Sequence, residues 1–311
     1  MKRLLLLLIG GVAAGAVLLA RRVAIREDLD WADASKPGRV ADIDGYGVHY
    51  VEQGAGPAIV LIHGFGGHTY HFRKIMPLLA HRHRVVALDL KGYGYSARDA
   101  GAGLSFTDQA VMVRGLMRHL GIDRAVIAGH SMGGAVARRF AATYPEATGA
   151  LVLIASVTGE EHMPRRMPAA PLFKRMVPIG AGLVAGRILK ASYYDPSVLT
   201  PEARAEYLRP IRIKGSMDGL LRSMSDRAKD HPIDDARITM PVLLLYGADD
   251  RVVPLSAAQR IRERLPHARL VVVQRAGHLL YDERPGECAG FIEEFLATST
   301  SVSGATFAAP A

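Results

Sequence analysis

Short apolar runs, each ended by glycine or a polar turn residue, recur along most of this chain. They are rich in Val, Ile and Leu and have no polar face, which is typical of strands buried on both sides in a mostly parallel sheet. The runs lie at residues 58–62, 84–89, 125–129, 150–154, 242–246 and 270–273. Two earlier segments, 39–44 and 47–53, flank Asp44-Gly45 and predict an antiparallel hairpin.

Between these runs lie amphipathic stretches with the spacing of helices. We expect helices at residues 71–80, 106–120, 135–144, 257–265 and 285–296. Parallel strands need a crossover connection, usually a helix, which then covers one face of the sheet. The chain is therefore predicted to be an α/β protein with a mostly parallel eight-stranded sheet flanked by helices.

The alternation stops over residues 157–236, which hold no strand-like run. Prolines separate helical pieces there, at 165–176, 181–189, 201–211 and 217–229. Helices inserted between two strands predict a cap over the edge of the sheet, with some of their apolar side chains facing a cleft. The core is then divided into residues 38–156 and 237–297, and the Ser-, Thr- and Ala-rich residues 298–311 are expected to form a flexible tail.

Residues 1–22 have a different character. An apolar run over residues 4–20 lies between the basic pairs Lys2-Arg3 and Arg21-Arg22. About 17 residues is the lower limit for crossing a bilayer, and this run has no polar face, so we expect a membrane anchor. A cleaved signal peptide is the alternative, because Ala14-Gly15-Ala16 resembles a cleavage site. The flanking charges do not decide orientation. We expect the rest of the chain on the periplasmic or extracytoplasmic side, anchored or secreted after cleavage.

Composition narrows the possible partners. The chain is 49% hydrophobic and has a net charge of +9, carried by arginines that are scattered along it. Nucleic-acid surfaces combine a basic cluster with stacking aromatic residues, and this sequence has no such segment, so we expect no nucleic-acid partner. Attraction to an anionic membrane surface fits the charge better. The single Cys288 excludes an internal disulfide and is expected to pack in the core.

The segment Gly129-His130-Ser131-Met132-Gly133-Gly134 follows an apolar strand and precedes a helix. A serine between glycines at such a corner is the G-x-S-x-G arrangement of a nucleophile elbow. The turn is too tight for side chains at Gly129 and Gly133, and it pushes the Ser131 hydroxyl out above the sheet. The following helix directs free N–H groups at the same place.

A serine hydroxyl needs a base, and the base needs a group that orients it. His278 is the candidate base, because it follows the last predicted strand and a glycine turn. The candidate acid is Asp250, which follows the strand at 242–246 beside Asp249. Only one of these adjacent carboxylates can face the histidine, and we expect Asp249 to hold the turn instead.

Two backbone N–H groups are candidates for binding an oxyanion. One belongs to Met132, directly after the serine, and the other to Phe65, in the turn His63-Gly64-Phe65-Gly66-Gly67. A glycine-rich turn after a strand also suggests phosphate binding. The G-x-G-x-x-G spacing and the P-loop lysine-serine pair are missing here, which argues against a nucleotide site.

Five segments together resemble one known superfamily. They are His63-Gly64-Phe65-Gly66, the stretch 89–96 (DLKGYGYS), Gly129-His130-Ser131-Met132-Gly133-Gly134, the acid turn 247–254 and Ala276-Gly277-His278. Over residues 39–296 the chain resembles the α/β-hydrolase superfamily. The resemblance implies Ser131 as nucleophile, Asp250 as acid, His278 as base, and the N–H groups of Phe65 and Met132 as oxyanion donors. It implies no metal and no organic cofactor.

Several branches of the superfamily fit less well. Haloalkane dehalogenases and epoxide hydrolases use an aspartate nucleophile, whereas this chain has Ser131. Prolyl iminopeptidases usually have Trp in place of Met132, meta-cleavage carbon–carbon hydrolases have Trp in place of Leu279, and haloperoxidase-like esterases often have Phe in place of His130. The chain then resembles broad carboxylesterases and membrane-anchored monoacylglycerol-lipase-like enzymes.

We therefore expect a serine hydrolase that cleaves carboxylic esters of hydrophobic substrates through an acyl-enzyme on Ser131. Carbon–carbon bond hydrolysis of the meta-cleavage type, with the same three residues, is one alternative. A non-catalytic small-molecule receptor on a hydrolase fold is another, although a receptor has no need of a complete Ser-Asp-His set.

Overall fold

The computed structural model describes residues 26–159 and 185–303. Within these ranges the strands form a single eight-stranded sheet in the order β1-β2-β4-β3-β5-β6-β7-β8. The predicted hairpin is confirmed, with β1 (Arg39–Ile43) antiparallel to β2 (Tyr46–Gln53). β2 also pairs antiparallel with β4, and the remaining neighbours pair in parallel, so the predicted fold class is confirmed.

The parallel strands begin and end within two residues of their predicted bounds. They are β3 (Ala58–Ile62), β4 (Arg84–Leu88), β5 (Ala125–His130), β6 (Thr148–Ile154), β7 (Val242–Gly247) and β8 (Arg269–Val273). Every residue of β3, β5, β6 and β7 is buried, as their continuous apolar sequences predict. β8 is only partly buried, because it lies at the edge of the sheet.

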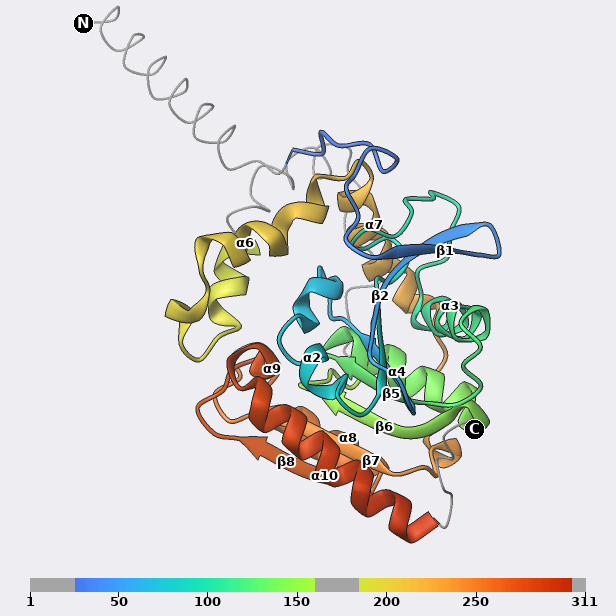
Figure 1. Ribbon diagram of the computed structural model, residues 1–311, viewed down its shortest axis with the longest axis vertical. Helices are drawn as coiled ribbons and strands as arrows, with labels where there is room; N and C mark the ends of the chain where they lie inside the picture. Colours follow the sequence, from blue (N-terminus) through green and yellow to red (C-terminus); the bar gives the residue numbers. More distant parts are fainter. Residues whose placement is uncertain (1–25, 160–184, 304–311) are drawn as a thin grey trace, which may run out of the picture.

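Helices cover both faces of the sheet (Figure 1). On one face pack α3 (Phe106–His119), α4 (Met132–Thr143) and α8 (Ser256–Arg264), against strand residues such as Val60 and Ile62. On the other face pack α2 (Met76–Leu79) and α10 (Pro285–Ser303), against Ile59 and Leu61. Alternate side chains of one strand thus enter opposite cores, as a pleated strand requires. Cys288 is fully buried in the second core, as predicted.

One predicted helix is wrong. In place of a helix over 71–80, the chain forms the 3-10 turn η1 (Thr69–Phe72) and then the one-turn helix α2. Pro77 is the reason, because its ring would collide with the Arg73 carbonyl in a continuous helix and it has no N–H to donate. Proline is accepted in the first turn of α2, where that N–H is not needed.

The flexible tail, expected from residue 298, was placed too early in the sequence, because the last helix extends past that residue. α10 continues through Ser303, and the hydroxyls of Thr298 and Ser299 donate to the carbonyl of Phe295 at 3.0 and 2.7 Å. The hydroxyl groups of these polar residues therefore find acceptors within the helix, and the helix does not end at them. The short helix α9 (Leu280–Glu283), directly after His278, was not predicted.

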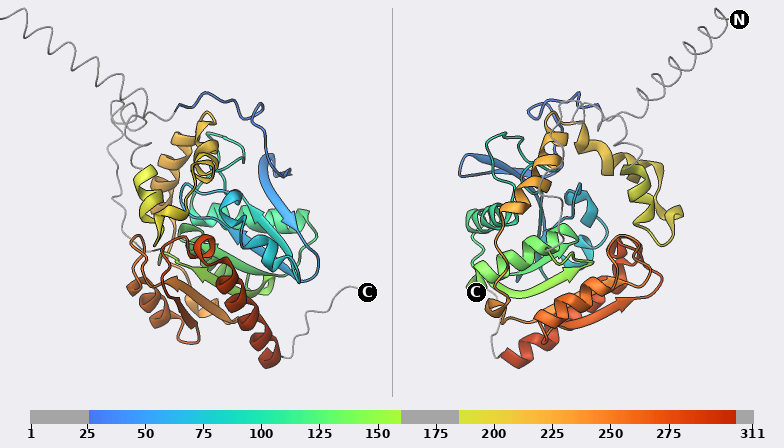
Figure 2. Two further views of the ribbon diagram at one scale, coloured as in Figure 1. Left: turned by 60° about the vertical axis from the view of Figure 1, so that its left-hand side comes forward. Right: turned by 180° about the vertical axis from the view of Figure 1, so that it is seen from behind.

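The cap, where the structure describes it, is helical as expected. It contains α6 (Pro201–Leu208), η4 (Arg209–Arg212), α7 (Ser216–Asp226) and η5 (Arg227–Lys229). The N-terminal residues 26–34 run along it: Leu29 forms a bridge with Ile213, and Leu29 N–H donates to the Arg212 carbonyl at 3.1 Å. In both views of Figure 2 the cap and this segment lie at the opposite end of the molecule from the end of α10.

Several sequence expectations fall outside these ranges. The predicted anchor at residues 4–20 and the predicted cap helix at 165–176 are not among the described residues, nor are residues 181–184 of the next predicted helix and residues 304–311 of the predicted tail. Within 26–159 and 185–303, no helix has the length and apolarity needed to cross a bilayer.

Candidate active site

The turn between β5 and α4 has the shape predicted for a nucleophile elbow. Ser131 has φ of 54° and ψ of −118°, a backbone conformation that non-glycine residues rarely adopt. A Cβ on Gly129 would overlap the Gly133 carbonyl, and a Cβ on Gly133 would overlap the carbonyls of Ile62 and His63. The two glycines are therefore required by backbone packing on both sides of Ser131, as expected from the sequence.

His278 and Asp250 are brought together from turns after β8 and β7. His278 Nδ1 lies 2.8 Å from Asp250 Oδ2, and both side chains are buried. The other carboxylate oxygen, Oδ1, accepts hydrogen bonds from the N–H groups of Val252 and Val253 at 2.7 and 2.8 Å. Those two bonds fix the carboxylate so that Oδ2 faces the imidazole. Of the adjacent pair, Asp250 rather than Asp249 contacts the histidine.

The turn that carries Ser131 contacts this pair. His130, the residue before the serine, packs on the His278 ring, with the ring centroids 4.6 Å apart. Ser131 and His278 are each less than one tenth exposed. No hydrogen bond joins the Ser131 hydroxyl to His278 in the described part of the chain. Such bonds are often long without substrate and shorten in the substrate complex.

The turn that carries Phe65 packs directly on the elbow. A Cβ on Gly64 would lie 3.0 Å from the Ser131 Cβ, which shows how closely the two turns approach. His63 fixes this turn, because its Nδ1–H donates to the Gly64 carbonyl at 2.7 Å and its Nε2 accepts from Leu90 N–H at 3.0 Å. Burial lowers the pKa of His63, in keeping with this neutral tautomer.

The N–H groups of Phe65 and Met132 both belong to this corner. Neither donates to another atom within residues 26–159 and 185–303, so both are available to a ligand. The two residues differ in exposure: Phe65 is 47% exposed, whereas Met132 is buried. The structure thus brings a serine at a positive φ, a His-Asp pair and two N–H groups without an acceptor in the described ranges to the carboxyl edge of one sheet.

Asp89 supports the neighbouring loops. It follows β4 in one of the segments that carry the resemblance, but the sequence alone did not assign it a role. Its Oδ1 accepts from Thr69 N–H at 2.6 Å, and its Oδ2 accepts from Tyr95 N–H at 2.7 Å and from His49 Nδ1 at 2.8 Å. Burial alone would raise the pKa of Asp89, but the bond and charge of His49 hold it at about 2. The ionised carboxylate therefore ties three segments together under the site.

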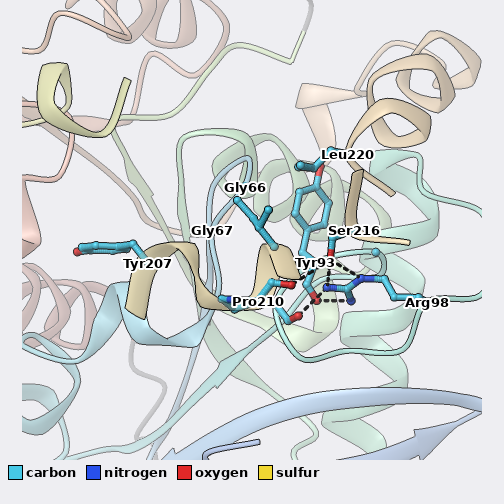
Figure 3. Close-up of a pocket in the computed structure, with 11 residues that line it drawn as sticks. Gly66, Gly67, Tyr93, Arg98, Tyr207, Pro210, Ser216 and Leu220 are labelled. Atoms are coloured by element: carbon cyan, nitrogen blue, oxygen red, sulfur yellow. Dashed lines mark hydrogen bonds between the residues drawn. The ribbon is translucent and has the colours of Figure 1, made fainter. Parts of the chain in front are cut away.

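A small pocket lies between the glycine turns of the core and the cap (Figure 3). Its lining is Gly66, Gly67, Gly92, Tyr93, Gly94 and Arg98 from the core, and Tyr207, Pro210, Ile211, Ser216 and Leu220 from the cap. Arg98 is tied down, since its guanidinium donates to the Gly94 carbonyl at 2.6 Å and to Ser216 Oγ at 3.1 Å. The cap residues were not identified from the sequence, because helical spacing does not show which side chains meet a loop of the core.

A metal site is not evident in this part of the molecule. No group of three or more His, Cys, Asp or Glu side chains within residues 26–159 and 185–303 is placed to hold a metal ion.

Comparison with known proteins agrees with this architecture. The family model of the alpha/beta hydrolase fold matches residues 57–285. The uncharacterized hydrolase YugF of Bacillus subtilis is 30% identical over 275 residues, covering 85% of this chain and 99% of that protein. A 2-hydroxy-6-oxononadienedioate/2-hydroxy-6-oxononatrienedioate hydrolase of Paraburkholderia phymatum is 31% identical over 242 residues, covering 74% and 84%.

A solved structure is similar over a greater length. The crystal structure of a membrane phospholipase A, described as a bacterial virulence factor, superposes with a TM-score of 0.70 at 29% identity. The match covers 96% of this chain and 99% of that one. With the family model matching most of the sequence, and the sheet and the elbow in place, this chain belongs to the α/β-hydrolase fold family.

Proposed function

We propose that this protein is a serine hydrolase that cleaves carboxylic esters of hydrophobic substrates, with Ser131 as nucleophile, His278 as base and Asp250 as the acid. The observation that carries the proposal is the 2.8 Å contact between His278 Nδ1 and Asp250 Oδ2 beside a serine held at a positive φ. The match to the alpha/beta hydrolase fold family, and relatives that are named as hydrolases, support the reaction type.

Asp250 orients the base. Because its Oδ2 accepts the Nδ1–H of His278, the Nε2 of the neutral ring has a free lone pair. That atom takes the proton of Ser131 as the hydroxyl oxygen attacks the ester carbonyl, and it then protonates the leaving alcohol. His278 next activates a water molecule, which releases the acid from Ser131. Asp250 stabilises the imidazolium in both steps.

The negative charge of each tetrahedral intermediate is placed on the former carbonyl oxygen. The N–H groups of Phe65 and Met132 bind it, the second at the first residue of α4, where the helix dipole adds favourable potential. Removing one such donor in other hydrolases costs about 10²- to 10³-fold in kcat. The packing of Gly64 on Ser131 keeps the two donors close to the reacting atom.

The cap supports the choice of hydrophobic substrates. Pro210, Ile211 and Leu220 line the pocket beside the Phe65 turn, together with Tyr93. An apolar group of the substrate that packs on these side chains would be removed from water, at about 25 cal/mol for each Å² buried.

Membrane attachment belongs to the same proposal. We assign residues 4–20 as the anchor, with the catalytic domain on the periplasmic or extracytoplasmic side. The likeness to a membrane phospholipase A over 96% of this chain supports the assignment. Full-length protein should sediment with membranes and resist carbonate washing, whereas a chain that begins at residue 23 should remain in the supernatant. Secretion after cleavage would instead give a shortened chain in the soluble extracytoplasmic fraction.

Fluorophosphonate labelling tests the catalytic assignment. The wild type should be labelled, Ser131→Ala should not, and the exposed cap variant Ser225→Ala should be labelled like the wild type. A parallel series of p-nitrophenyl esters, from acetate to dodecanoate, should show higher kcat/KM for medium or long chains. An unlabelled wild type would overturn the proposal, and acetate as the best ester would overturn its hydrophobic part.

One other reaction is supported by a specific observation. The Paraburkholderia relative, at 31% identity, is named as a hydrolase of 2-hydroxy-6-oxononadienedioate, the kind of compound on which a carbon–carbon bond hydrolase acts. The same Ser-Asp-His set would serve that reaction. Loss of the absorbance of a ring-cleavage dienoate, without turnover of simple esters, would favour this alternative.

A further inference from the structure

Arg227 of the cap reaches over the corner that carries the two free N–H groups. Its Nη2 lies 3.1 Å from the Met132 sulfur, and its Cζ lies 5.3 Å from the ring centroids of Phe65 and Phe106. Phe65 and Met132 are the residues whose N–H groups are proposed to bind the oxyanion. A cation from the cap is therefore placed beside both residues of this corner.

Arg227 differs from the other cations of this region in its partners. Within the described part of the chain no carboxylate pairs with it, and its Nε is buried with no hydrogen-bond partner. The neighbouring cations differ in this respect: Lys229 pairs with Asp226 at 2.6 Å, and Arg138 donates to Asp235 at 2.7 Å.

An unpaired guanidinium at a partly buried position is unfavourable unless something compensates it. The two aromatic rings provide part of the compensation through cation–π contacts, which use the face of the guanidinium. They do not use the N–H donors in its plane, one of which faces the weakly accepting Met132 sulfur, with the Tyr93 hydroxyl also within reach of the guanidinium. Those donors form a planar fork that matches the two oxygens of a carboxylate or of a phosphate.

We propose that Arg227 binds an anionic group, a carboxylate or a phosphate, carried by the ester substrate close to the scissile bond. The inference rests on the proposed esterase function and adds the substrate class. Tyr93, whose hydroxyl lies 3.6 Å from the same Met132 sulfur, lines the pocket together with the apolar side chains of Pro210, Ile211 and Leu220. The favoured substrate is thus an amphiphilic ester, with an apolar part under the cap and an anion on Arg227.

Two pairs of esters test the proposal and separate the two possible positions of the anion. Monoethyl succinate and ethyl 4-methylpentanoate have nearly the same shape and differ in the charge of the acyl end. 1-Butyrylglycerol 3-phosphate and 1-butyrylglycerol differ in a charge on the alcohol. We expect the wild type to prefer the charged member of at least one pair. Arg227→Gln should reduce kcat/KM for that member by about 10- to 100-fold and for the neutral member by less than about 3-fold.

Matched variants control for charge and folding. Lys229→Gln removes the same charge two residues away and should leave both ratios unchanged, because Lys229 is 73% exposed. Arg227→Lys keeps the charge but not the fork, and should fall between the wild type and Arg227→Gln. If Arg227→Gln lowers kcat/KM equally for charged and neutral esters, Arg227 acts on the oxyanion. If the ratio of kcat/KM between the charged and the neutral ester stays at its wild-type value, Arg227 does not recognise the anion. Either result overturns the proposal.

Binding distinguishes failure of this inference from failure of the proposed function. If the wild type hydrolyses none of the four esters and is not labelled by fluorophosphonate, the esterase assignment fails. The anion site is then tested by titrating hexyl phosphate and hexanol calorimetrically. Tighter binding of hexyl phosphate that is lost in Arg227→Gln supports the site. Equal affinity in both proteins excludes it.

Discussion

His130 Nε2 donates a hydrogen bond to the backbone carbonyl of His278 across 3.0 Å. A carbonyl can only accept, so the proton of a neutral His130 ring lies on Nε2, and its buried Nδ1 has no partner in the described structure. Burial, and then the nearby His278, lower the pKa of His130 well below its ordinary value. The residue before the serine therefore stays uncharged and fixes the main chain of the proposed base.

Replacing His130 tests this positioning role. His130→Phe keeps a ring against His278 but removes the donor, so we expect kcat to fall about 10-fold with little change in KM, as for the loss of one hydrogen bond. His130→Gln can still donate and should recover part of the loss. The exposed His231→Gln is the control. Because His130 is neutral, the acidic side of the pH profile of kcat/KM should have the same midpoint in the His130 variants as in the wild type. A lower Tm with unchanged kcat would mean that His130 only supports the fold.

Glu283 connects the other side of the same loop to the cap. Its Oε2 accepts from Gly277 N–H at 2.7 Å, and its Oε1 accepts from the N–H groups of Tyr194 and Asp195 at 2.9 and 3.1 Å. A Cβ on Gly277 would lie 2.7 Å from the Ser192 carbonyl, so the loop before His278 packs directly on the start of the described cap. One carboxylate thus holds both segments.

Glu283→Gln should weaken this connection. An amide has one accepting end, so its NH₂ group must face either Gly277 or the cap N–H groups, and a favourable contact becomes unfavourable. We expect kcat/KM to fall at least 10-fold and Tm to fall by several degrees. Glu287→Gln, an exposed change one turn later on the surface of α10, is the control. Activity that stays at the wild-type level would contradict the connection between cap and histidine.

The elbow and the acid turn could be predicted because their chemistry is local. The glycines around Ser131 are required by a strand-to-helix corner, and Asp250 and His278 follow β7 and β8, whose carboxyl ends any parallel sheet aligns at one edge. Contacts between loops could not be predicted in the same way. Nothing in the local sequence of Glu283 or Arg227 shows that one accepts from the cap or that the other faces Met132, since both contacts depend on how the cap is placed on the core.

Buried neutral histidines make acid stability a further test. Burial lowers the pKa of His68 from 6.5 to about 4, and the nearby Asp89 compensates only in part. Between these values the unfolded chain binds a proton that the folded chain does not. His68 therefore leaves the free energy of unfolding unchanged above pH 6.5. It lowers that free energy by about 3 kcal/mol once the pH reaches 4. The pKa values of His63, His71 and His130 are lowered in the same direction, so their losses add.

Urea unfolding at pH 7 and pH 5 measures this effect. The free energy of unfolding should be clearly lower at pH 5, and the difference should be smaller in His68→Gln, which has no proton to gain. The comparison uses the difference between the two pH values, so any constant loss of packing in the variant cancels. The exposed His231→Gln should keep the wild-type difference. An equal pH effect in wild type and His68→Gln would show that His68 does not contribute.

Two Gly→Ala variants test the packing of the elbow. A Cβ on Gly133 would overlap the carbonyls of Ile62 and His63, which belong to the main chain of β3 and its turn and cannot move without displacing the Phe65 segment. Gly133→Ala should therefore cost about 3 kcal/mol or more, and should lower fluorophosphonate labelling even at low temperature.

Gly290 lies within α10, and a Cβ added there would meet no atom within 4 Å, so Gly290→Ala should stabilise the protein by about 0.5–1 kcal/mol through helix propensity. Thermal unfolding of the two proteins measures both effects on one scale. A Gly133→Ala protein that unfolds and is labelled like the wild type would contradict the close approach of the elbow to β3.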